Sequence, residues 1–141
     1  METMKQNSKL DYGLFLIIVG VLAWAVPGGG HFILKERKRA IIIFVTVSVT
    51  FLVGLYIGSI GVIDPVGAWP WFLPQMLTSP AVGFLAHITK TGEYITYGKA
   101  GDIGQIYTSI AGLLNLLCIT SAVYMAYCGR GEIIGEEEEN V

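Results

Sequence analysis

The sequence predicts an all-α membrane protein with three transmembrane helices and one short helix that lies in the interface or re-enters the membrane. The first observation is an uncharged, mostly apolar run of 24 residues from Ala40 to Ile63. A helix rises about 1.5 Å per residue, so about 20 such residues cross a hydrocarbon core of roughly 30 Å. The second observation is that the runs 12–34 and 103–127 also carry no formal charge. The third is the composition, which is 53% hydrophobic and only 14% charged.

The first span is expected at about 11–34, with a break at 27–30. Pro27 opens a run of three glycines, and these four residues together cannot continue a stable helix. We expect a helix from about 11 to 26, then a turn, then a short helical lead into the basic residues that follow. A cleaved signal peptide is the alternative, because Lys5 and Lys9 precede the apolar stretch. The continuation of the apolar run to Leu34 favours the span.

The second and third spans are expected at 39–60 and 103–127. Each carries small residues at helical spacing, and such residues let helix backbones approach closely in lipid. The residues that we single out for helix packing are Gly54, Gly58, Gly61, Ala111, Gly112 and Asn115. We expect these faces to meet inside one chain, with docking of a partner protein on the Gly54–Gly58 face as the alternative. Because a buried amide is costly unless paired, we expect Asn115 to bond a hydroxyl or carbonyl of a neighbouring helix.

The segment 66–89 is uncharged, but three prolines divide it. Tryptophans near its start favour the headgroup level, where aromatic rings gather. Ser79 and Pro80 form a good helix start, so we expect a short helix over 80–89. An interfacial or re-entrant position is therefore predicted for 66–89, and a fourth full span is the alternative.

The orientation follows from a basic loop at 35–39. Four of the nine lysines and arginines of the chain lie there, and basic residues in short loops mark the cytoplasmic side. The residues expected to orient the chain or contact lipid headgroups are Lys35, Arg37, Lys38 and Arg39. With three spans, the acidic tail 129–141 is cytoplasmic and the N-terminus lies outside, although Lys5 and Lys9 argue the other way. Four spans would move the tail outside.

The remaining candidate residues form the turn after the first helix. They are Pro27, Gly28, Gly29, Gly30 and His31. We expect His31 to cap a helix or contact headgroups. No catalytic, cofactor or metal site is expected, because the histidines lie far apart and Cys118 and Cys128 are too distant on one helix to bridge each other.

Two stretches resemble a known family. Residues 23–32, followed by 35–39, resemble the W-x-x-P-G-x-G-H-x-x-x-G-R hairpin of small bacterial membrane proteins of unknown function. That hairpin is itself similar to a two-transmembrane-helix domain with a glycine-rich turn. Residues 106–108 and the A-G-L-L-N-L-L run at 111–117 are similar to the last helix of the family. One departure is the charged pair Lys35-Glu36, which stands where the family has glycine. The resemblance implies a bacterial inner-membrane protein and no particular reaction.

The function expected from these features is that of a non-enzymatic accessory or scaffold subunit of a larger membrane complex. The whole chain, 1–141, is one polytopic membrane domain in this interpretation. An oligomeric channel or transporter component and a lipid-binding, membrane-organising protein are the alternatives. Expected partners are membrane lipids and larger membrane subunits or further copies of the chain. Nucleic acid is not expected as a partner, because the formal net charge is −2.

Overall fold

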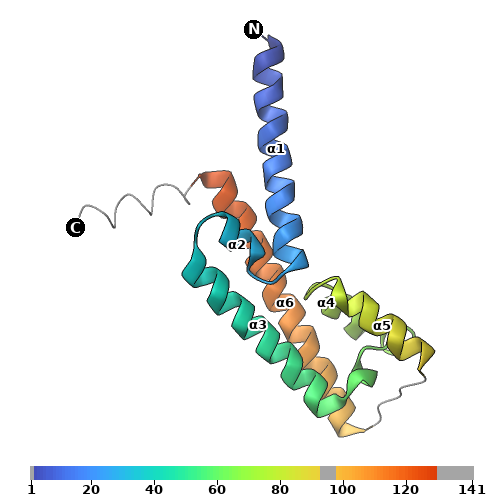
Figure 1. Cartoon of the computed structure of the whole chain (residues 1–141). Coiled ribbons are helices and arrows are strands. Elements are labelled where there is room, and N and C mark those ends of the chain that lie inside the picture. The colour runs from blue at the N-terminus through green and yellow to red at the C-terminus, as the bar shows by residue number, and fades with distance from the viewer. Residues whose placement is uncertain (1, 93–97, 130–141) are drawn as a thin grey trace.

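The computed structural model describes residues 2–92 and 98–129, and for residues 2–10 it describes the backbone alone. This part of the chain is helical and contains no strand. Its elements, in chain order, are α1 (Glu2–Ala25), α2 (Gly29–Ile33), α3 (Arg37–Gly58), the 3-10 helix η1 (Ile60–Val62), α4 (Trp69–Met76), α5 (Ala81–Thr91) and α6 (Lys99–Cys128) (Figure 1).

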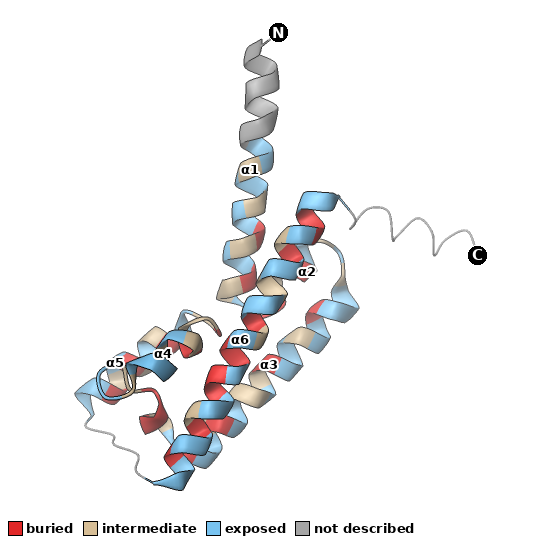
Figure 2. Ribbon diagram, turned by 180° about the vertical axis from the view of Figure 1, so that it is seen from behind, coloured by how far each residue is buried: buried red, intermediate tan, exposed pale blue. Residues whose placement is uncertain are grey.

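The helices α3 and α6 form the frame of the molecule. Both are long and apolar enough to cross a membrane, and they pack against each other more extensively than any other pair of elements. A Cβ atom on Gly54 would lie 2.9 Å from the backbone nitrogen of Thr108, and one on Gly58 would lie 3.0 Å from the Cα of Gly104. Glycine at these positions therefore permits direct backbone contact, and Figure 2 shows buried residues along the inner side of α6.

The segment 11–34 forms a hairpin of α1 and α2. The Tyr12 hydroxyl donates to the carbonyls of Tyr127 (2.6 Å) and Ala126 (3.3 Å), beside the C-terminal end of α6. After the turn, Arg39 comes within 3.7 Å of the Met125 sulfur, at that same end. The expected turn is therefore present but does more than interrupt a span. It reverses the chain, so 11–34 begins and ends at one end of the molecule instead of running its length.

Glycines explain how so short a hairpin closes. Gly28 has φ 83°, in the left-handed region that glycine adopts readily. A Cβ on Gly30 would lie 2.9 Å from the Cβ atoms of both Ala23 and Ala122, so α2 fits between α1 and α6 only with glycine there. The sequence interpretation placed the glycines wholly in a turn, whereas α2 begins within them, at Gly29.

A second hairpin, of α4 and α5, starts from the opposite end. Near the end of α3, Asp64 accepts hydrogen bonds from the backbone nitrogens of Val66 and Gly67, each at 2.9 Å, and this turn leads toward α4. The short helix expected at 80–89 is present as α5. The prolines of the segment predict breaks, so α4 is not expected from the sequence. Pro70 lies in the first turn, where backbone N–H groups have no intrahelical partner in any case.

The two hairpins pack on successive parts of α6. A core cluster of Val19, Ala23, Ala122 and Ala126 joins α1 to the C-terminal part of α6. The hairpin of α4 and α5 packs on η1 through Val62, Ile63, Val82 and Ala86. The helix α6 therefore contacts both hairpins. The tips of the two hairpins approach each other beside the middle of α6.

Candidate functional site

The candidate site is the junction at which the two hairpin tips meet. The Trp24 indole donates to the Met76 carbonyl at 2.9 Å, and the Ser79 hydroxyl donates to the Ala25 carbonyl at 3.1 Å. Ala25 and Met76 are the last residues of α1 and α4, where carbonyl groups have no intrahelical donor. Each hairpin thus supplies a hydrogen-bond donor to an otherwise unpaired carbonyl at the helix end of the other hairpin.

Asn115 ties this junction to α6. Its side chain is fully buried, and its amide nitrogen lies 2.9 Å from the Leu77 carbonyl, 3.0 Å from that of Thr78 and 3.4 Å from that of Ala23. The first two carbonyls belong to the tip of the α4–α5 hairpin and the third to α1. Asn115 therefore bonds carbonyls of both hairpins, the kind of partner that the sequence suggested for it.

Gln75 provides a second buried amide that the sequence interpretation missed. Its nitrogen donates to the Thr108 hydroxyl oxygen (2.8 Å) and to the Val62 carbonyl (3.2 Å), so it links α4 to α6 and η1. Beside it, the Ser109 hydroxyl donates to the Trp71 carbonyl at 3.1 Å. A lone glutamine within an uncharged, proline-divided stretch was the available signal, because a side-chain amide in such surroundings needs a partner.

The predicted packing residues fall into two groups. Gly54 and Gly58 face α6 inside the chain, as the preferred interpretation expected. Gly112 contacts the hairpin of α4 and α5, because a Cβ atom on Gly112 would collide with the backbone of Pro74 in α4. Ala111 is fully buried on α6, and Gly61 is buried in η1.

The turn residues follow the end of α1, and Pro27 lines a hollow together with Ala25 and Ser79 of the junction. Pro27 and Gly28 are buried, and a Cβ on Gly28 would lie 3.3 Å from the Cα of Ala40 at the start of α3. His31 is 2% exposed, and its Nδ1 has no hydrogen-bond partner among the described residues. The expected headgroup contact of His31 is thus wrong, because α2 folds inward against α1 and α6.

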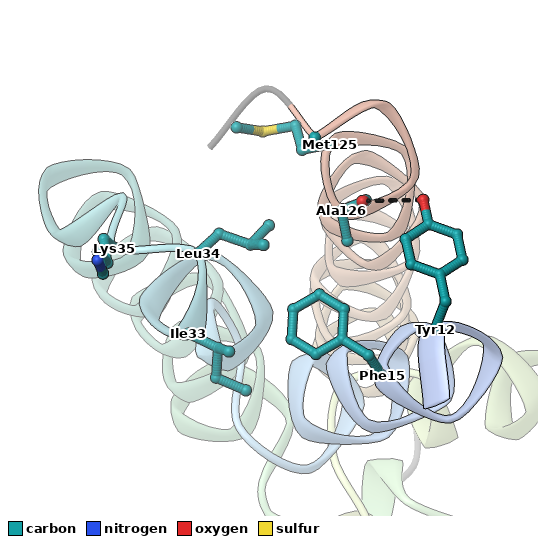
Figure 3. A pocket seen from close by; sticks show the side chains of 8 residues that line it. Tyr12, Phe15, Ile33, Leu34, Lys35, Met125 and Ala126 are labelled. Carbon is teal, nitrogen blue, oxygen red and sulfur yellow. Dashed lines mark hydrogen bonds between the residues drawn. The ribbon is translucent and has the colours of Figure 1, made fainter. Parts of the chain in front are cut away.

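The four predicted basic residues are all exposed, around the loop between α2 and α3. The Arg39 guanidinium lies 3.7 Å from the Glu36 carboxylate and 3.7 Å from the Met125 sulfur, which belongs to α6. Lys35 has φ 63° and borders a mostly apolar hollow of about 290 Å³. Figure 3 shows Phe15 and Leu34 pointing into this hollow between α1, α2 and the end of α6. The acidic tail lies outside the described residues from 130 onward.

The hydrogen bonds of the site fix the backbone at the ends of α1 and α4. Four buried side-chain atoms in or beside the site have no hydrogen-bond partner in the described part of the chain. They are His31 Nδ1, Gln75 Oε1, Thr78 Oγ1 and Asn115 Oδ1. Within residues 2–92 and 98–129, no group of three histidines, cysteines, aspartates or glutamates is placed to hold a metal ion.

Fold and site together define a small helical protein with two helices long and apolar enough to span a membrane and two inserted hairpins. Residues 4–131 match a family described as a family of unknown function (DUF6677), and the chain belongs to that family. No curated protein matches the chain. No solved structure matches it either.

Proposed function

We propose that this protein is a non-enzymatic accessory subunit that shapes or seals a larger membrane complex. The observation that carries the proposal is the junction of the hairpins. Trp24, Ser79, Gln75 and Asn115 all bond backbone carbonyls across elements, so the polar side chains inside the molecule are used to hold its shape. A fixed shape with an apolar exterior is what a scaffold offers to its neighbours.

The helix α1 supplies the proposed docking surface. Its side away from α6 carries Leu14, Ile17 and Val21, which are 57%, 63% and 54% exposed. The apolar part of α1, from Asp11 to Ala25, is only about 22 Å long. Because α1 ends inside the molecule and does not cross it, this exposed apolar side is available to pack against a neighbouring protein.

We also propose that the protein resides in the bacterial cytoplasmic membrane, with the loop at 35–39 on the cytoplasmic side. The excess of basic residues in that short loop supports the orientation. The Tyr12 end of α1 and the C-terminal end of α6 lie beside this loop. The proposal therefore puts both termini in the cytoplasm, in agreement with Lys5 and Lys9 and in place of the external N-terminus first expected.

The test is purification of the tagged full chain from its native membrane in mild detergent, followed by native mass measurement and peptide identification. We expect larger subunits in a constant ratio. Ile17→Trp should remove them, whereas Ile42→Trp should not, because Ile42 lies on α3 and is equally exposed at 64%. Recovery of the chain alone, or of a homo-oligomer only, would contradict the accessory role.

A transport component is the second candidate, and the opposed hairpins favour it. Discontinuous helices that end near the bilayer midplane form substrate sites in many transporters. Here α1 and α4 both end at the junction, where their carbonyl ends converge. The measurement is solute flux from proteoliposomes that contain a purified homo-oligomer. Flux no greater than that of empty vesicles would remove this candidate.

A further inference from the structure

An apolar groove runs along α3 on the side that faces α1, because α1 and α3 flank α6 without packing on each other. Two adjoining hollows of about 450 and 490 Å³ make up the groove, and they share Val26, Pro27 and Phe44. The first extends to Ala40, near the start of α3, and the second extends to Leu52. The second hollow borders the junction at Ala25 and Ser79, but the proposed accessory role makes no use of the groove.

The dimensions of the groove fit an acyl chain. From Ala40 to Leu52 the helix rises about 18 Å, close to the thickness of one leaflet, which is about half of a hydrocarbon core of roughly 30 Å. An extended acyl chain is apolar and of this length, so it matches a groove whose lining is almost wholly apolar.

The charge at one end of the groove selects the headgroup. On α3, Arg37 precedes the groove residues Ile41 and Phe44 by four and seven positions, which places all three on one face of the helix. Arg37 is exposed, whereas Arg39 is turned toward α6 and Glu36. Arg37 thus lies where a lipid phosphate would sit when the acyl chain fills the groove.

We infer that this groove is a binding site for one anionic phospholipid, with its phosphate on Arg37 and an acyl chain along α3 to Leu52. The neighbouring Lys38 adds positive charge at the same end. A basic residue near the surface favours an anionic lipid by roughly a fivefold factor in affinity. The inference goes beyond the accessory role and does not depend on it, because Ile17 tests the partner and Arg37 tests the lipid.

The experiment titrates the purified full chain with phosphatidylglycerol or phosphatidylcholine of identical acyl chains, and counts bound lipids by native mass measurement. We expect tighter binding of phosphatidylglycerol. Arg37→Gln should lower its affinity about fivefold and lower that of phosphatidylcholine much less, because the choline group balances the phosphate charge there. The control is Lys90→Gln, an exposed basic residue in the last turn of α5, which should change neither affinity.

A second pair of variants tests the groove itself. Ser48→Trp places a large side chain in the groove and should weaken binding of both lipids, whereas Ile42→Trp, on a different face of α3, should not. Equal binding of the two lipids by the unaltered protein would overturn the inference. So would an unchanged preference in Arg37→Gln, or unchanged binding in a folded Ser48→Trp. If Ser48→Trp does not fold, Arg37→Gln decides the matter, because its side chain is on the surface.

Discussion

At the scale of the residue, Asn115 shows how one uncharged side chain can organise several helices. It has two amide protons and three carbonyl acceptors within 3.4 Å, from α1 and from the tip of the other hairpin. The surrounding apolar side chains cannot replace these donors, so the carbonyls at the ends of two helices depend on one buried side chain. Its importance could be predicted from the sequence, since it is the most polar group deep in an apolar run, but its partners could not.

Replacing Asn115 with leucine should destabilise the protein by about 1–3 kcal/mol, because buried carbonyls lose their donor. Thr120→Val is the matched control on the same helix. Thr120 is exposed and bonds only the Leu117 carbonyl, within its own helix, so its loss should cost much less. Reversible unfolding in detergent measures both. Equal costs for the two variants would show that the Asn115 bonds do not hold the hairpins.

Gly112 should tolerate no side chain. Gly112→Ala places a methyl group against the Pro74 backbone, so α4 must move away from α6, and overpacking of this kind costs about 1–3 kcal/mol. Gly13→Ala is the control, because a Cβ there meets nothing within 4 Å. Alanine favours a helix over glycine by about 1 kcal/mol, so this variant should be neutral or more stable. The same unfolding measurement distinguishes them.

At the scale of the element, the hairpins are the least predictable part of the fold. The long helices α3 and α6 follow from uncharged runs of sufficient length, and their residues Gly54 and Gly58 pack as small residues at helical spacing suggest. The direction of the chain after Pro27 does not follow from such a run. A turn in an apolar segment is compatible with a kinked span or a return, and only packing of Gly30 on Ala122 decides between them.

The helix α4 is a second element that could not be predicted from the local sequence. Pro74 is unfavourable inside a helix, yet α4 is held by Gln75, which bonds Thr108, and by Ser109 of α6, which bonds the Trp71 carbonyl. These contacts are made with residues distant in the sequence, so local propensity carried no signal of them.

The two hairpins should be energetically coupled through their tips. Trp24→Phe and Ser79→Ala each remove one donor to the opposite hairpin, at a cost of about 0.5–1.5 kcal/mol apiece. Because each loosens the same junction, the double variant should cost less than the sum of the single ones. The measurement is a double-mutant cycle by unfolding in detergent. Additive costs would mean that the hairpins are anchored independently on α6.

At the scale of the whole molecule, the two long helices and the two hairpins predict a membrane topology that can be tested directly. Single cysteines are introduced at Asp11, Lys35 and Asp64 after Cys118 and Cys128 are replaced by alanine. In intact cells or sealed vesicles, an impermeant thiol reagent should label positions 11 and 35 from one side and position 64 from the other. A three-span arrangement requires instead that positions 11 and 35 be labelled from opposite sides.

The position of α6 in the chain has a consequence for how the protein is made. Both hairpins are complete before Lys99 emerges from the ribosome, yet Asn115 and Gly112, which receive them, lie in the helix that is synthesised last. Until then, the carbonyls at Ala23 and Leu77 lack the amide that pairs with them in the finished fold. Assembly of this molecule therefore waits for its final helix, and a chain that stops at Thr91 has both hairpins but not the helix that joins them.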